Sequence, residues 1–276
     1  MSLLHAIVLG IVQGLSEFLP ISSSGHLVLV PWLFGWNDFS DVAVKKAFDV
    51  ALHIGTLVAV VGYFWRDLSR YVGDGTRYVL RRKKDPTVHG RMAWMFLLAT
   101  IPAAAVGALL DTWIDDTLGK PWLIGVSLIV FGLLLAWADT LDGNRHEDTF
   151  TRRDAWRVGI AQALALNPGT SRSGITMTAA RTAGFSRTAA ARISFVMSVP
   201  VISGAVVFKL AKLTQDGVPD GFITPMIVGV IAAAVSGWLA IATLMKVVST
   251  RSLKPFVLYR IAAGIAVLLI SASTWR

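Results

Sequence analysis

The sequence predicts an all-α integral membrane protein, with six transmembrane helices and two re-entrant helical hairpins in an inverted-topology repeat. The chain of 276 residues is 54% hydrophobic and only 16% charged, whereas about 25% of the residues of soluble domains are charged. Several apolar stretches reach the length of about 20 residues that a bilayer span needs. One short pattern also occurs twice, at a constant separation of 149 residues (Gly10 to Gly159).

The repeated pattern is an apolar helix followed by a Ser/Gly turn. The first copy reads Gly10-Ile11-x-Gln13-x-Leu15, then Ser22-x-Ser24-Gly25; the second reads Gly159-Ile160-x-Gln162-x-Leu164, then Ser171-x-Ser173-Gly174. This self-similarity indicates two related halves, 1–138 and 139–276, within one membrane domain. In proteins of this kind the site lies where the two broken helices meet.

The spans follow from length and hydropathy. Six stretches are expected to cross the bilayer: 47–65, 92–110, 121–138, 193–211, 223–245 and 256–275. Two further apolar regions, about 3–34 and 155–183, are interrupted by Pro, Gly and Ser. We interpret each as a re-entrant hairpin of two short helices.

The basic residues indicate the orientation. Four connections, 66–91, 139–157, 181–192 and 246–260, hold 19 of the 26 Lys and Arg residues and are expected to face the cytoplasm. Three spans separate the hairpins, so the first should enter from outside and the second from the cytoplasm, with both termini outside. The net charge of +9 is thereby explained by cytoplasmic loops, and nucleic acid is not expected as a partner. The N-terminus shows no signal-peptide pattern and is expected to be mature structure.

Two ionisable residues stand out inside the interrupted regions, Glu17 and Arg172. A charged group at membrane depth costs about 2.5–3.5 kcal/mol on insertion scales and is a candidate for function. The alternative is a structural ion pair that braces the two halves.

The first interrupted region has the composition of a phosphate site. Gln13 and Glu17 are four residues apart and share a helix face. After Pro20, the residues Ser22, Ser23, Ser24, Gly25 and His26 open the next half-helix. A helix N-terminus with nearby hydroxyls binds phosphate. The alternative is that the serines only cap the helix.

The second turn supplies small residues and one guanidinium. Thr170, Ser171, Ser173 and Gly174 allow a ligand close to the backbone, and Arg172 can bind phosphate oxygens through two N–H groups. Further along the first half, Asp49 and His53 share a face and could line the same cavity, or form an interfacial pair bonded to water.

Metal binding is restricted by the residue types present. The chain has no Cys, and no His/Asp/Glu cluster has the spacing of a transition-metal site. This leaves a hard divalent cation, Mg²⁺ or Ca²⁺, held by Glu17 and by phosphates of a substrate.

The segments Gln13–His26 and Pro168–Gly174 resemble the two signatures of the bacterial undecaprenyl-diphosphate phosphatase family, also called the bacitracin-resistance family. The resemblance runs over the whole chain. It implies hydrolysis of undecaprenyl diphosphate to undecaprenyl phosphate and inorganic phosphate at the outer face of the bacterial plasma membrane, with a divalent cation. This recycles the lipid carrier for peptidoglycan synthesis, cell-wall biogenesis and cell shape, and confers bacitracin resistance. The family's acidic motif begins with Glu or Gln; here it is Gln13, which leaves Glu17 as its only carboxylate.

These residues fit two functions. In a phosphatase, Arg172, Ser22 and Ser24 hold the diphosphate, Ser23 or an activated water attacks, and His26 with Glu17 moves the proton. The alternative is a polyprenyl-phosphate transporter or flippase, because broken helices in inverted repeats are typical of transporters. A Glu and a His beside three serines favour the enzyme. The expected partners are the polyprenyl diphosphate and membrane lipid; a homodimer is left open.

Overall fold

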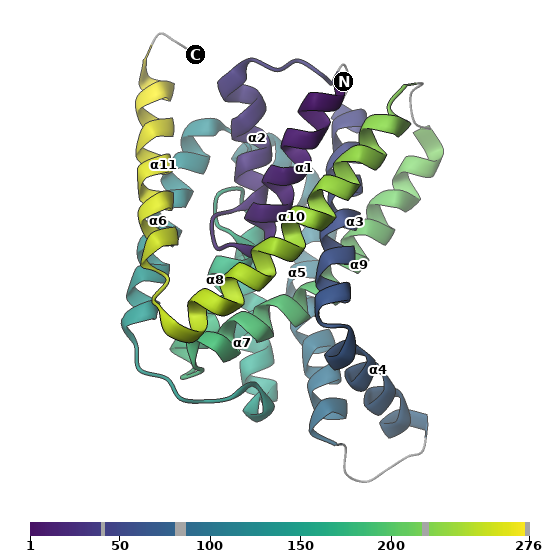
Figure 1. The fold of residues 1–276 in the computed structure, drawn as a ribbon, viewed down its shortest axis with the longest axis vertical. Helices are drawn as coiled ribbons and strands as arrows, with labels where there is room; N and C mark the ends of the chain where they lie inside the picture. Colours follow the sequence, from purple (N-terminus) through teal and green to yellow (C-terminus); the bar gives the residue numbers. More distant parts are fainter. Residues whose placement is uncertain (40–41, 81–86, 217–220, 274–276) are drawn as a thin grey trace.

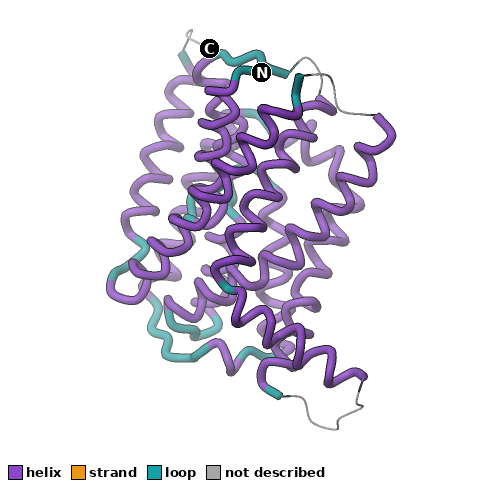
Figure 2. The backbone as a smooth tube through the Cα atoms, turned by 45° about the vertical axis from the view of Figure 1, so that its right-hand side comes forward, coloured by secondary structure: helices purple, strands orange, loops and turns teal. Residues whose placement is uncertain are grey.

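A computed structural model describes residues 1–39, 42–80, 87–216 and 221–273. Within these ranges the chain is helical and contains no strand (Figures 1 and 2). The helices are α1 (Leu3–Phe18), α2 (Ser23–Phe34), α3 (Val42–Tyr63), α4 (Trp65–Leu80), α5 (Val88–Leu118), α6 (Pro121–Thr140), α7 (Arg152–Ala163), α8 (Arg172–Thr182), α9 (Arg187–Asp216), α10 (Ile223–Thr250) and α11 (Lys254–Ala272). Two 3-10 turns, η1 (Glu147–Thr149) and η2 (Leu164–Leu166), lie beside α7.

Five of the described helices, α5, α6, α9, α10 and α11, contain segments long and apolar enough to span a membrane, and α3 with α4 forms a sixth candidate across a bend of 84°. The predicted spans 92–110, 121–138, 193–211 and 223–245 lie within α5, α6, α9 and α10. The span 47–65 ends at the first residue of α4, beyond the end of α3, and 256–275 runs past the end of α11, with residues 274–275 outside the described part. The prediction of an all-α, multi-pass membrane protein is therefore confirmed.

The prediction that 66–91 is a connecting loop between spans is wrong for residues 66–80, which belong to α4, and for residues 88–91, which begin α5. Leu68, Tyr71 and Gly75 recur at helical spacing and lie on the less exposed face, and α4 packs against α5. Arg66 and Arg70 lie on the exposed face. Arg66, Arg70 and Arg77 thus belong to an amphipathic helix, and Arg91 to α5. The remaining basic residues of this connection, Arg81, Arg82, Lys83 and Lys84, lie outside the described residues.

The two interrupted regions each form a pair of short helices. In Figure 1, α1 and α2 occupy the upper half of the molecule, near both termini, while α7 and α8 occupy the lower half. Their entry into a bilayer from opposite faces, and the division into halves at residue 138, stay predictions.

Matched glycines allow each helix pair to pack against the other half of the chain. The helix α1 lies along α10, and α7 lies along α5. A Cβ added to Gly10 would be 2.5 Å from the carbonyl oxygen of Gly229, and one added to Gly159 would be 2.6 Å from that of Ala99. Because no Cβ fits at either crossing, both copies of the repeated Gly serve close helix packing, and the two halves are interlocked.

An aromatic core supports the place where the turns meet. Phe18 is fully buried and contacts Phe195 of α9 edge to face, with ring centroids 5.5 Å apart. Each ring is next in sequence to a polar residue, Glu17 or Ser194, and both of these residues contact Arg172. Packing of the two rings therefore fixes the backbone that presents the polar groups.

Candidate functional site

The turn between α1 and α2 contacts the turn between α7 and α8 directly. The hydroxyl of Ser22 accepts a hydrogen bond from the N–H of Gly169 (3.1 Å), and the hydroxyl of Ser173 donates to the carbonyl of Leu19 (3.1 Å). These bonds join residues about 150 positions apart in the chain, so the tertiary fold places both predicted turns in one site.

The two turns share an unusual backbone conformation. Ser22 and Ser171, matched in the repeat, have φ angles of 81° and 72°. Positive φ is rare outside glycine and costs about 1–3 kcal/mol, a strain often found at functional sites. Each Ser caps the following helix by accepting from a glycine N–H, that of Gly25 at 3.4 Å and that of Gly174 at 3.2 Å. These hydrogen bonds offset part of the strain and fix the start of α2 and α8.

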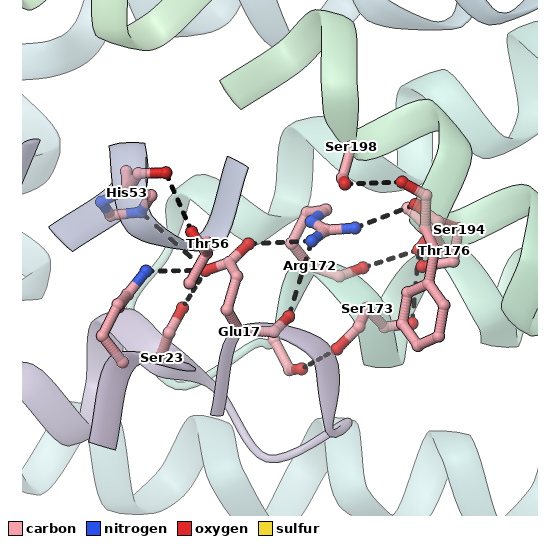
Figure 3. A network of polar contacts seen from close by, with 12 residues as sticks. Glu17, Ser23, His53, Thr56, Arg172, Ser173, Thr176, Ser194 and Ser198 are labelled. Atoms are coloured by element: carbon pink, nitrogen blue, oxygen red, sulfur yellow. Dashed lines mark hydrogen bonds and ion pairs between the residues drawn. The ribbon is translucent and has the colours of Figure 1, made fainter. Parts of the chain in front are cut away.

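Glu17 is the centre of the polar network shown in Figure 3. Its carboxylate is buried, with 6% of its side chain exposed. The Oε1 atom accepts from Nη2 of Arg172 at 2.8 Å, while Oε2 accepts from Oγ of Ser23 at 2.7 Å and from Nε2 of Gln13 at 3.2 Å. Arg172 also donates from Nη1 to the carbonyl of Ser194 (2.9 Å). A nucleophile candidate, a carboxylate and a guanidinium therefore form one connected group.

His53 joins this network, whereas the carboxylate of Asp49 does not. The Nδ1 atom of His53 lies 2.6 Å from the carbonyl oxygen of Asp49, so Nδ1 carries the proton and donates. Nε2 then faces Glu17, 3.9 Å from its Oε2 (Figure 3). The carboxylate of Asp49 instead accepts from Nζ of Lys45 at 3.1 Å.

His26 has other partners. Its Nδ1 donates to the carbonyl of Ser22 (2.7 Å), and its Nε2 lies 2.7 Å from the hydroxyl of Tyr259 on α11. Within the described part of the chain, no hydrogen bond links His26 to Glu17 or Ser23. Proton transfer by His26 stays a prediction that these contacts do not support.

The remaining hydroxyls of the predicted diphosphate site differ in exposure. Thr170, Ser171 and Ser173 are buried; Oγ1 of Thr170 accepts from Asn167 (3.0 Å), and the hydroxyls of Ser171 and Ser173 lie 3.2 Å apart. These groups hold the second turn together. Ser24 is exposed at the start of α2, so it is better placed to meet a ligand.

Comparison with known proteins decides the family. Residues 6–266 match the family model described as bacitracin resistance protein BacA. The chain belongs to the BacA family. Proteins named undecaprenyl-diphosphatase are similar over nearly their whole length. One from Pelotomaculum thermopropionicum is 45% identical over 99% of this chain and 98% of its own. One from Geobacter metallireducens is 46% identical over 98% of both, and one from Moorella thermoacetica is 47% identical over 95% of both. The predicted resemblance of the chain to this family is confirmed.

Arg260 contacts both turns of this site, and the sequence pattern does not predict it. The prediction that Arg260 belongs to the cytoplasmic connection 246–260 is wrong, because Arg260 lies within α11 and is fully buried. Its guanidinium donates to the carbonyls of Pro20 (3.2 Å), Gly169 (2.8 Å) and Thr170 (2.9 Å). Its position inside the apolar stretch 256–275 was the available signal.

The oxygen atoms at the site fit a hard divalent cation. Among the described residues no group of three His, Cys, Asp or Glu side chains could hold a metal. Glu17 accepts a hydrogen bond from Nε2 of Gln13, and Oε1 of the same amide is buried and has no hydrogen-bond partner. Carboxylate and amide oxygens suit Mg²⁺ and Ca²⁺, with the remaining ligands supplied by water or phosphate.

Proposed function

We propose that this BacA family member hydrolyses undecaprenyl diphosphate to undecaprenyl phosphate and inorganic phosphate. The names of the similar proteins support this activity. The observation that carries it is the hydrogen bond of 2.7 Å from the Ser23 hydroxyl to Glu17, whose other oxygen is bound by Arg172. A hydroxyl beside a buried carboxylate and a guanidinium is suited to phosphoryl transfer.

Arg172 and the two half-helices bind the diphosphate. The first N–H groups of α2 and α8 lack partners within their helices and carry the positive end of the helix dipole. Both helices begin at the site, at Ser23 and at Arg172. The Nε atom of Arg172 has no hydrogen-bond partner among the described residues, so it is free to donate to a phosphate oxygen. Ser24, exposed beside Ser23, adds a hydroxyl.

Ser23 is the proposed nucleophile. Its Oγ attacks the terminal phosphorus, its proton passes to Glu17, and the bond from that phosphorus to the bridging oxygen breaks. Undecaprenyl phosphate leaves with the electron pair of that bond. Water then attacks the phosphoserine, inorganic phosphate departs, and the proton held by Glu17 returns to Ser23. The hydrogen bond between Ser23 and Glu17 provides the path for both proton transfers.

His53 is the second proton carrier in this scheme. Its Nδ1 is held by the backbone of Asp49, so its Nε2 is directed at Glu17. His53 can take the proton from Glu17 between the two steps, and the protonated imidazole would then stabilise the ionised carboxylate. His26, bonded to Ser22 and Tyr259, positions the start of α2 instead.

A divalent cation, Mg²⁺ or Ca²⁺, would be held by Glu17 and Gln13 and would neutralise charge on the diphosphate oxygens. Glu17 carries one negative charge, whereas Arg172 and such an ion together carry three positive charges. The excess positive charge would attract the diphosphate, so Arg172 and the metal would both contribute to substrate binding.

The reaction is proposed to take place at the outer face of the plasma membrane, which would recycle the lipid carrier and confer bacitracin resistance. Two features support this side. The described parts of the basic connections, α4 and the segment 141–151 among them, lie at the end of the molecule opposite both termini, and the pair α1–α2, which carries Glu17 and Ser23, lies in the half near the termini (Figure 1). The polyprenyl chain stays in lipid between the spans.

Phosphate release by the purified protein tests the proposal. The protein in detergent is incubated with a polyprenyl diphosphate, with and without a chelator, and Arg172→Lys is measured beside it. We expect release by the wild type, loss with the chelator, and a steep fall in Arg172→Lys, because Lys keeps the charge but lacks the planar fork. Absence of phosphate release with Mg²⁺ or Ca²⁺ present, together with movement of the lipid across vesicles, would instead identify a transporter.

A further inference from the structure

We propose that Arg260 is a positioning residue that sets the geometry of both turns and supplies an unpaired positive charge close to the diphosphate. This inference rests on the proposed function. The inference goes beyond the proposed function by assigning a role to a residue of α11 that lies outside both sequence signatures.

The contacts of Arg260 reach three parts of the chain. The first turn contributes the carbonyl of Pro20, and the second contributes those of Gly169 and Thr170. Nε donates to the carbonyl of Leu128 on α6 (3.1 Å). One guanidinium therefore joins both turns to the rigid pair α6–α11, which pack against each other.

The bonds fix the peptide planes as well as the position of the second turn. A peptide unit is planar and trans, so its C=O and N–H point in opposite directions. When Arg260 holds the carbonyl of Thr170, the N–H of Ser171 must point away from Arg260. Arg172 follows Ser171 directly and carries the guanidinium that contacts Glu17. Rotation of this peptide would displace Arg172, and a displacement of about 1 Å can lower a rate about 100-fold.

The space for Arg260 is built by glycines on two helices. A Cβ added to Gly174 on α8 would lie 2.9 Å from Nη1 of Arg260, and one added to Gly132 on α6 would lie 3.3 Å from its Cβ. Gly174 belongs to the repeated Ser-x-Ser-Gly pattern. The Arg260 side chain thus fills a space that exists because Gly174 and Gly132 lack a Cβ. An Arg side chain on the surface would need no such space.

The charge of Arg260 is not balanced by an acid. Every hydrogen-bond acceptor of its guanidinium is a carbonyl oxygen, and among the described residues no carboxylate forms an ion pair with it. Glu17 and Arg172 neutralise each other. The junction therefore keeps an excess positive charge in a buried setting, where charge interacts more strongly than in water. This favours a diphosphate over a neutral lipid headgroup.

Two substitutions separate geometry from charge. Arg260→Lys keeps the charge but loses the fork, and Arg260→Gln loses both. The variants are purified in detergent, the folded fraction is measured, and kcat is determined per folded molecule. Binding is measured as inhibition by inorganic pyrophosphate. We expect kcat of Arg260→Lys to fall about 100-fold while its affinity for pyrophosphate stays within about threefold. Arg260→Gln should in addition bind pyrophosphate about tenfold more weakly.

Arg181→Lys is the matched control. Arg181 is also buried, and its guanidinium donates to two backbone carbonyls, those of Leu141 and Phe185, at the other end of α8. We expect Arg181→Lys to lose stability but to keep kcat per folded molecule within about twofold, because it holds no part of the two turns.

The outcomes are distinguishable. Wild-type-like kcat per folded molecule in Arg260→Lys, with an active wild type, overturns the inference and leaves the proposed function intact. An inactive wild type refutes the proposed function itself. If Arg260→Lys does not fold, Gly132→Ala displaces the same side chain more gently. It should lower kcat about tenfold, and an unchanged kcat would again overturn the inference.

Discussion

Replacing Glu17 by Gln separates the chemical role of the carboxylate from its role in packing. If the new amide oxygen stays on Arg172, the amide nitrogen faces Ser23 and Gln13, where Oε2 accepted two hydrogen bonds of 2.7 and 3.2 Å. The Ser23 hydroxyl can rotate and the Gln13 amide can turn to accept instead. Arg172 also keeps its bond to the carbonyl of Ser194. The loss of stability should therefore be about 1–3 kcal/mol.

The effect on turnover should be much larger. An amide cannot take the proton of Ser23, and general-base catalysis contributes about 10²–10⁴ in rate. With no other carboxylate in contact with Ser23 among the described residues, we expect kcat to fall at least about 10³-fold, equivalent to about 4 kcal/mol. The assay is phosphate release per folded molecule, with the thermal midpoint measured on the same sample.

Asp67→Asn is the control for Glu17→Gln. The carboxylate of Asp67 pairs with Arg192 at 2.8 Å, the same distance as Glu17 to Arg172, but at α4. This variant should keep full turnover. If Glu17→Gln retained turnover within about tenfold of the wild type, the pair would be a structural brace and the assignment of Glu17 as a base would be refuted.

Three further predictions follow from the contacts. Ser23→Ala should be almost inactive and the wild type should yield a trapped phosphoserine by mass spectrometry; turnover of Ser23→Ala within about tenfold of wild type, about 1.4 kcal/mol, would show that water attacks. His53→Ala should shift the pH profile of kcat because His53 faces Glu17, whereas His26→Ala should change the rate without that shift; the opposite pattern would restore His26 as the proton carrier. Burial raises the pKa of Asp154, but hydrogen bonds from Arg145 and from its own capping box outweigh it and hold the pKa below the ordinary 3.8. Its contribution to stability should be complete above about pH 4 and be lost as the pH falls through the folded pKa, and thermal midpoints of Asp154→Asn should lack this acid-dependent loss.

Local pattern in the sequence predicted the spanning helices and the two matched turns. A long apolar stretch predicts a spanning helix, because inside a bilayer the backbone N–H and C=O groups must bond to each other and a helix satisfies them all. The repeated pattern matches Gly10 with Gly159 and Ser22 with Ser171, and it predicts two related helix–turn segments. Both pairs have corresponding roles in the structure. The segment 66–80 was misjudged, since its charges concealed a helix whose apolar face packs on α5.

Only the tertiary structure decided which polar groups meet. The sequence ranked His26 above His53 because His26 lies beside the serines, yet His53 faces Glu17 and His26 faces Tyr259. Arg260 is 240 residues from Pro20 and still bonds to it. Helix periodicity indicates which residues share a face, but the partner of that face depends on how distant helices cross. For this protein, the sequence determined the helices and the chemistry available, and the packing of α11 and α3 against the turns decided which side chains can use it.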